Sequence, residues 1–278
     1  MLYCYFGHHK AATTFIGQSV VREVCRNIGM RWSIVNQPAD FDCNLTNYSR
    51  KKSIDFLAYV NADDSFVKKI DIPFIGFHVI RDPRDVIISA YFSHRNSHSV
   101  DGWPELSDHR AKLRNDNFEE GLLRELDFIF DLMTDGASLH PFKSMAEWDY
   151  TRNNILELRY EDMVGKSKDF FVELFEFLGL VKPRQFEYNS KIINKLFPGK
   201  HRKLPCIQKS KLDLILDRTS FASVSGGRKL GIEDTTSHYR KGIPGEWKSQ
   251  FSEKVKEKFK EVYPGLVTSL GYERNENW

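Results

Sequence analysis

Residues 3–16 constrain the fold more than any other stretch of the chain. An apolar run is followed there by a short polar loop and by a helical pattern that opens on Thr13 and Thr14. This strand–loop–helix order directs backbone N–H groups toward a bound anion. The loop differs from the P-loop of ATP-binding proteins, because Ala12 stands at the second glycine position and Lys10 comes too early. We therefore predict a phosphate site built on similar physics in a different loop.

Strands and helices alternate along much of the remaining chain. Apolar runs predict strands at residues 56–60, 73–80 and 155–160, and helical periodicity predicts helices at 14–27, 169–178 and 253–262. The segment 31–52 reads as turns, and most of the last third reads as irregular. The alternation favours an α/β fold with a central parallel sheet flanked by helices and a P-loop-like loop. Because no Pro-, Gly- or Ser-rich linker interrupts the pattern, we expect one domain over residues 1–278.

A second strand–helix junction is predicted at Arg81. Asp82 suits the N-cap, Pro83 the first helical position and Asp85 the third position of a capping box. Ser89 lies about two turns into that helix, so it reaches the same phosphate as Arg81 only if the helix folds back beside the strand. For Arg81 taken alone, a surface ion pair is the alternative interpretation.

The composition narrows the class of protein. A net charge of +3 is only mildly basic and argues against nucleic-acid binding. The four cysteines have no metal-like spacing, which favours a reducing, cytoplasmic location. No run approaches membrane-spanning length, and the N-terminus lacks the pattern of a secretion signal. His94 and His98 have helical spacing but lack the glutamate of H-E-x-x-H and an evident third ligand, so we predict no metal site.

Three separated motifs together resemble the cytosolic-type sulfotransferases that use 3′-phosphoadenosine-5′-phosphosulfate (PAPS). Residues 9–15 are similar to the family's 5′-phosphosulfate loop, 81–89 to its 3′-phosphate motif, and 240–247 to its closing loop R-K-G-x-x-G-[DE]-W. The motifs follow in the family's order and span the chain. The resemblance implies transfer of the sulfuryl group from PAPS to a hydroxyl or amine of a small-molecule or carbohydrate acceptor. The product of the donor would be 3′-phosphoadenosine-5′-phosphate (PAP).

The resemblance also implies which residues hold the cofactor. Lys10 would stabilise the leaving oxygen, and two aromatic rings would flank the adenine. Ala12 stands where the family has a glycine, and the family's dimer motif is only echoed at residues 248–257, which leaves the oligomeric state open. The implied cofactor-binding residues are Lys10, Ala11, Ala12, Thr13, Thr14, Phe15, Arg81, Ser89, Tyr160, Thr219, Phe221, Arg240, Lys241 and Gly242.

The general base is where the sequence departs from the family. Cytosolic members usually place a histidine some twenty residues before the Arg81 position, and this chain has none there. The candidates are His8, His9, Asp63 and a carboxylate within residues 38–55. We favour His9, which makes Lys10 and His9 the expected catalytic residues.

Two other functions stay open at this point. An ATP-dependent nucleoside or small-molecule kinase would use Asp82 in a Walker-B-like position, but kinases need magnesium and a lysine beside the hydroxyl residue. A catalytically inactive nucleotide- or carbohydrate-binding relative would fit the missing family histidine. The sequence does not identify the acceptor.

Overall fold

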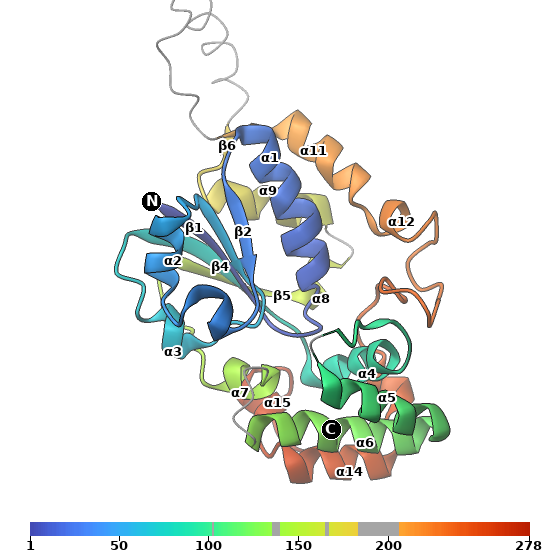
Figure 1. Ribbon diagram of the computed structural model, residues 1–278. Coiled ribbons are helices and arrows are strands. Elements are labelled where there is room, and N and C mark those ends of the chain that lie inside the picture. Colours follow the sequence, from blue (N-terminus) through green and yellow to red (C-terminus); the bar gives the residue numbers. More distant parts are fainter. Residues whose placement is uncertain (102, 135–139, 165–166, 183–205) are drawn as a thin grey trace, which may run out of the picture.

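Five parallel strands form the central sheet of the computed structural model, in the order β2-β3-β1-β4-β5 (Figure 1). The structure describes residues 1–101, 103–134, 140–164, 167–182 and 206–278. The predicted α/β fold with a parallel sheet is confirmed. The strands are β1 (Leu2–Gly7), β2 (Trp32–Val35), β3 (Phe56–Tyr59), β4 (Phe74–Ile80) and β5 (Ile155–Arg159).

Helices cover both faces of the sheet, which explains why its strands read as continuous apolar runs. Along β1, Tyr5 belongs to the core on one face, whereas Cys4 and Phe6 belong to the core on the other, and all three are fully buried. One face is covered by η1 (Thr14–Val21, a π-helix), α1 (Arg22–Ile28), α9 (Ser167–Phe177) and α11 (Lys209–Arg218). The other is covered by η2 (Pro38–Phe41), α2 (Leu45–Lys51) and α3 (Asp64–Val67).

A separate layer of helices packs around its own apolar core beyond the carboxyl end of β4 (Figure 1). Helix α14 lies along α6 and α4 packs on α6, so segments far apart in the sequence lie side by side. The layer contains α4 (Pro83–Phe92), η3 (Ser93–Ser97), α5 (Pro104–Asn115), α6 (Phe118–Thr134), α7 (Pro141–Ala146), α13 (Trp247–Gln250), α14 (Glu253–Val262) and α15 (Leu266–Ser269).

Shorter elements complete the described chain. Helix α8 (Tyr160–Met163) follows β5 directly, and α12 (Phe221–Val224) follows α11. Strands β6 (Val181–Lys182) and β7 (Ile207–Gln208) form a small parallel pair.

The predictions missed β2 and α11. The polar residues around β2 suggested turns, but its four residues pair with β3 in the sheet. Helix α11 lies in the part expected to be irregular, and only three of its residues, Leu212, Ile215 and Leu216, are buried. By contrast, the structure has a helix at exactly the predicted residues 253–262, and Gly29 ends the first helix in a left-handed conformation.

The sheet order places a functional crevice between β1 and β4. The chain leaves β1 toward β2 and β3 on one side, and it leaves β4 toward β5 on the other. Ligands of open parallel sheets bind at such a switch point, outside the carboxyl ends of the strands. Gly7 and Val79 are register partners, so the loops after both strands begin side by side.

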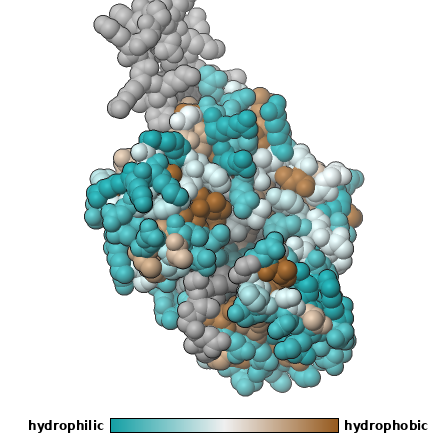
Figure 2. Space-filling view, in the orientation of Figure 1, coloured by the Kyte–Doolittle hydropathy of each residue, from teal (hydrophilic) through white to brown (hydrophobic). Residues whose placement is uncertain are grey.

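The surface in the view of Figure 1 is mostly hydrophilic, with apolar residues in small separate patches (Figure 2). Among the described residues, no helix combines the length and the apolar character needed to cross a membrane. The four cysteines are all free thiols.

The close approach of β1 and β4 leaves no room for a side chain at Gly76, which can be tested by substitution. A Cβ there would lie 2.8 Å from the backbone oxygen of Cys4, whereas a Cβ at Gly17 would meet its nearest atom at 3.5 Å. We expect Gly76→Ala to lower the free energy of unfolding by about 1–3 kcal/mol. The matched change Gly17→Ala, on η1, is expected to be neutral or stabilising by up to about 1 kcal/mol. Denaturant unfolding checks both, and equal effects would contradict the close approach.

Candidate functional site

A cavity of about 590 Å³ opens at the carboxyl ends of β1 and β4. It is lined by residues from all three motifs singled out in the sequence, although these motifs are far apart along the chain. Of the predicted site residues, those that line it are His9, Lys10, Ala12, Thr13, Thr14, Phe15, Arg81, Ser89, Tyr160, Phe221, Arg240, Lys241 and Gly242.

Lys10 lies in the loop after β1 with its backbone in the left-handed region, at φ 63°. Its carbonyl oxygen accepts a hydrogen bond of 3.1 Å from Arg81 Nη1, so the two phosphate-binding candidates are joined directly. The pKa of Lys10 is lowered to about 7, mainly by burial and in addition by Arg81 and Arg240, while Glu125 opposes this shift. A polyanionic ligand would restore the charged form, because nearby negative charge favours the ammonium.

Ala12 also has a left-handed backbone, at φ 60°. This conformation explains why a glycine suits the position, since a Cβ is strained there. Gly7, at the start of the loop, is constrained by space instead. A Cβ would lie 2.4 Å from the Tyr5 hydroxyl and 2.9 Å from the Thr13 methyl group.

Arg81 is buried, yet one of its nitrogens has no partner. Its guanidinium stacks 4.4 Å from the ring centroid of Tyr160, and its Nε makes no hydrogen bond in the described part of the chain. A buried, unpaired guanidinium N–H is costly unless an acceptor reaches it. Ser89, on α4, lines the same cavity, as expected if the helix folds back beside the strand.

The prediction of a capping box at the start of α4 is wrong, because Asp82 and Asp85 do not form one. Asp82 is the N-cap and accepts from the Arg84 N–H, but its own N–H donates to Glu161 instead of Asp85. Asp85 accepts hydrogen bonds from the backbone N–H groups of residues 245 and 247. It therefore fixes the closing loop to α4, a contact between distant segments that a local pattern cannot reveal.

Arg84 strengthens the same connection. Its guanidinium is paired with both oxygens of Asp82 at 3.0 and 2.8 Å. It lies between two indole rings, 3.5 Å from the centroid of Trp247 and 4.6 Å from that of Trp278. This buried cation holds the end of the closing loop against the helical layer.

The basic side chains of the closing loop are paired with Glu246. Arg240 donates to both of its carboxylate oxygens, and Lys241 Nζ donates to one of them at 3.0 Å. Arg240 also donates to Glu233. Burial would raise the pKa of Glu246, but Arg240 and Lys241 lower it overall. The loop thus presents two cations that an internal carboxylate already holds together.

Two predicted residues do not line the cavity. Ala11 is fully buried, and its N–H donates to the His8 carbonyl oxygen. The hydroxyl of Thr219 donates to the Ile215 carbonyl oxygen within α11. Phe15 and Phe221, the two predicted adenine neighbours, both line the cavity.

Sequence reasoning missed Arg228, His98 and His238 as cavity residues. Arg228 donates to the carbonyl oxygens of Arg240 and Tyr239 at 2.7 and 2.6 Å, and these hydrogen bonds hold the start of the closing loop in place. His238 Nε2 lies 3.0 Å from the Thr14 hydroxyl oxygen. No local feature of the sequence indicated the contacts of Arg228 or of His238.

His8 and His9 point into different hydrogen-bond networks. His8 is buried, its Nε2 is 2.7 Å from His78 Nε2, and His78 Nδ1 is 2.6 Å from Glu157 Oε2. His9 Nε2 is 3.1 Å from His94 Nε2, and His94 Nδ1 is 2.7 Å from Glu125 Oε1. Of the two, only His9 lines the cavity.

The other candidate bases lie elsewhere. The Asp63 carboxylate caps α3 by accepting from the Ser65 N–H, and neither Asp63 nor any residue of 38–55 lines the cavity. This placement favours His9 among the candidates considered, because a base must reach the acceptor.

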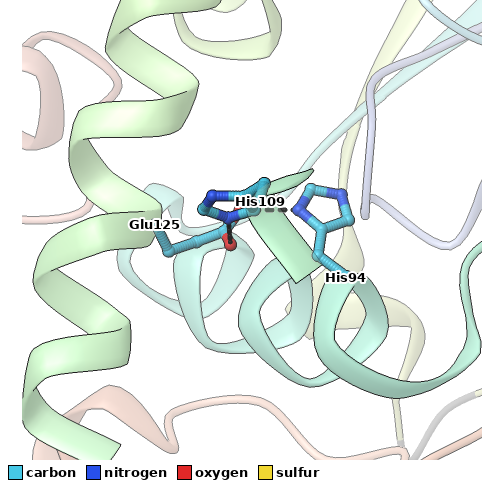
Figure 3. A group of neighbouring side chains, drawn as sticks. All are labelled: His94, His109 and Glu125. Atoms are coloured by element: carbon cyan, nitrogen blue, oxygen red, sulfur yellow. Dashed lines mark hydrogen bonds and ion pairs between the residues drawn. The ribbon is translucent and has the colours of Figure 1, made fainter. Parts of the chain in front are cut away.

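Three buried side chains, His94, His109 and Glu125, form a group (Figure 3), and His94 joins it to His9 through the contact between their Nε2 atoms. Their donor atoms all lie within 4.8 Å of one another, a spacing that a metal ion could use. Both carboxylate oxygens already accept hydrogen bonds, from His94 Nδ1 at 2.7 Å and from His109 Nε2 at 2.8 Å. His98, the expected helical partner of His94, is not part of the group.

The family of the chain follows from comparison with known proteins. The sulfotransferase domain family matches residues 77–271, and the chain therefore belongs to this family. The matched part contains the Arg81 motif and the closing loop, whereas the loop of Lys10 precedes it.

Individual relatives are distant. Mouse (Mus musculus) sulfotransferase 2A6 is 27% identical over 194 residues, which are 67% of this chain and 54% of the relative. Mouse sulfotransferase 2A2 is 26% identical over 196 residues, 68% of this chain and 54% of the relative. The chain thus spans about half the length of these curated relatives. The crystal structure of mouse sulfotransferase SULT7A1 complexed with PAP has a TM-score of 0.53 and 15% identity, covering 95% of this chain and 84% of that one.

The network of His8, His78 and Glu157 predicts a pH effect on stability. Burial raises the pKa of Glu157 to about 7, above its ordinary value of 4.5. A raised pKa in the folded state favours folding while the group is protonated, and this contribution is lost as the pH rises through 7. Because Gln resembles the protonated acid, the stability of Glu157→Gln relative to the wild type should increase by roughly 1–2 kcal/mol between pH 5 and 8.

Urea unfolding of both proteins at several pH values measures this difference. Burial lowers the pKa of His78 to about 3 and holds that of His8 well below its ordinary value, and both side chains are present in the two proteins. A difference that stays constant with pH would contradict the raised pKa of Glu157.

Proposed function

We propose that this chain transfers the sulfuryl group of PAPS to an acceptor hydroxyl or amine. One observation supports this above all: two groups of cationic side chains line one cavity at the switch point of the sheet. The first is Lys10, and the second consists of Arg81, Arg240 and Lys241. Two phosphate sites suit a nucleotide phosphorylated at both the 5′ and 3′ positions. The family membership supports the same donor. The proposal takes residues 1–278 as one sulfotransferase domain acting in the cytoplasm on a small-molecule or carbohydrate acceptor.

The residues present fit the proposed donor. The buried Nε–H of Arg81 has no hydrogen-bond partner among the described residues, and it could donate to a 3′-phosphate oxygen. Ser89, Arg240, Lys241 and the Gly242 N–H would complete that site. At the other site, Lys10 with the N–H groups at Thr13 and Thr14 would hold the 5′-phosphosulfate, since a helix begins there. Phe15 and Phe221 would flank the adenine, with Tyr160 near its edge.

The reaction then follows from charge and proton balance. The acceptor oxygen or nitrogen forms a bond to sulfur while the bond from sulfur to the 5′-phosphate oxygen breaks. The leaving oxygen takes the bonding electrons, and Lys10 stabilises its growing negative charge. His9 takes the proton of the acceptor and later releases it to water. Positioning of the two reactants in one cavity supplies much of the remaining acceleration.

A kinase is a less suitable alternative. Asp82, which would bind magnesium in a kinase, is paired with Arg84 through both carboxylate oxygens. A kinase also has no use for a second phosphate site at Arg81. An inactive binding protein remains distinguishable only by assay, because it would bind PAP but transfer no sulfate.

The 3′-phosphate provides the first test. PAP at a hundred times its dissociation constant should stabilise the protein by about 2.7 kcal/mol without magnesium. At the same concentration, 5′-AMP should give a much smaller shift in Tm, since it leaves the Arg81 site empty. In Arg81→Ala, PAP should protect no better than 5′-AMP. Protection by ATP with magnesium but not by PAP would favour the kinase.

Turnover provides the second test. Lys10→Met should lower kcat by about 10²–10³-fold in sulfate transfer from labelled PAPS, because the leaving oxygen loses its cation. The exposed Lys51→Met, on α2, serves as the matched control and should keep wild-type kcat. A panel of sugars, phenols and amines supplies the acceptor. Wild-type turnover in Lys10→Met would refute the role of this lysine, and binding of PAP without any transfer would indicate an inactive relative.

A further inference from the structure

A continuous chain of hydrogen bonds runs from the cavity into the helical layer through His9. From His9 Nε2 it passes to His94 Nε2 at 3.1 Å, from His94 Nδ1 to Glu125 Oε1 at 2.7 Å, and from Glu125 Oε2 to His109 Nε2 at 2.8 Å. It joins the loop after β1 to η3, α6 and α5. Figure 3 shows the two histidines converging on the carboxylate of Glu125.

The members of this chain are fixed in place by burial and ring packing. His94 and Glu125 are fully buried, and His109 is 5% exposed. The ring of His109 stacks on Phe128 with centroids 3.8 Å apart, and the ring of His94 packs edge-on against Trp103. This packing restricts rotation of the two imidazole rings and keeps them next to the carboxylate of Glu125.

The positions of the protons follow from Glu125. Burial would raise its pKa, but His94 and His109 outweigh this and lower it to about 2, so the carboxylate is ionised and only accepts hydrogen bonds. His94 must therefore donate from Nδ1, which leaves its Nε2 as an acceptor. His9 must then donate from Nε2, and its Nδ1 keeps a lone pair. That Nδ1 has no hydrogen-bond partner among the described residues, and His9 lines the cavity.

We propose that His94, Glu125 and His109 are positioning residues that hold His9 in the tautomer whose Nδ1 lone pair is free to take the acceptor's proton. This inference rests on the proposed function, in which His9 takes the acceptor's proton. The arrangement uses the same logic as a buried carboxylate that orients a catalytic histidine, extended by one imidazole. His109 keeps the second oxygen of Glu125 from turning away.

The network also balances the charge that His9 acquires. Burial lowers the pKa of His9 below its ordinary value, and the neighbouring titratable groups lower it in addition. These groups are Lys10 in its own loop, His94 on η3, His98 just after η3 and His238 just before the closing loop. Glu125 is the anion at the far end of the chain. When His9 takes the acceptor's proton at Nδ1 it keeps its own proton on Nε2, and that N–H donates to His94 Nε2, whose Nδ1–H in turn donates to the Glu125 carboxylate.

The first test reads the tautomer directly and needs no substrate. Two-dimensional ¹H–¹⁵N spectra of ¹⁵N-labelled protein report which ring nitrogen carries the proton, and the signals missing from His9→Gln identify His9. At pH 7 we expect the proton on Nε2 of His9 and on Nδ1 of His94 in the wild type. In Glu125→Gln the amide offers one acceptor and one donor, so His9 should lose its single tautomer. A proton on Nδ1 of His9 in the wild type would overturn the proposal.

The second test separates positioning from binding. Glu125→Gln should lower kcat about 10–100-fold while the Kd for PAP stays within about twofold. Glu119→Gln, the same change at a half-exposed residue of α6 that pairs with Lys254 at 3.9 Å, should keep wild-type kcat. An unchanged kcat in Glu125→Gln would overturn the proposal, as would activity lost with EDTA and restored by Zn²⁺, which would assign the group to a metal. If Glu125→Gln does not fold, the wild-type spectrum still decides.

The two proposals can fail separately. If no acceptor receives sulfate from PAPS, the proposed function fails, whereas the tautomer of His9 is still measured. If His9→Gln keeps kcat while Lys10→Met loses it, sulfate transfer stands, but the base and its positioning network are refuted.

Discussion

The parallel pairing of β1 with β4 is the constraint on which the rest of the site depends. Because the two strands run in the same direction and in register, the loop of Lys10 and the residue Arg81 emerge at one edge and contact each other. Gly76 makes this approach possible, since its missing side chain leaves room for the Cys4 backbone. Everything else at the site, including the closing loop, is arranged around this junction.

A set of buried charges attaches the closing loop to that junction. Asp85 accepts from the backbone at residues 245 and 247, and Arg84 lies between Trp247 and Trp278. Such groups stabilise a structure only when their partners are complete, because an unpaired buried charge is strongly destabilising. The motif around Arg84 therefore has two separate tasks: Arg81 and Ser89 face the cavity, while Arg84 and Asp85 fasten the loop that covers it.

Local patterns predicted the elements, and distant contacts explain most of what they missed. Some elements could be predicted because their signal lies within one short segment. These are the strands predicted at residues 56–60, 73–80 and 155–160, from their apolar runs, and the helix at 253–262, from its helical period. Strand β2 is four residues long, too short to show such a period, and its place in the sheet is set by its parallel pairing with β3. Asp85 resembled a local cap, but its partners lie 160 positions away. The contact of His9 with His94, 85 positions apart, is equally invisible in the sequence.

The pairing of Arg240 and Lys241 with Glu246 has a consequence for how a phosphate would arrive. The incoming anion would not meet two free cations. It would take over contacts that a carboxylate already makes, so the step is an exchange of one anion for another, with Glu246 released or shared. An exchange gains less from simple charge attraction than the two basic residues suggest, and it is correspondingly less sensitive to ionic strength. Without a ligand, the Glu246 carboxylate makes the contacts with Arg240 and Lys241 that a bound phosphate would make.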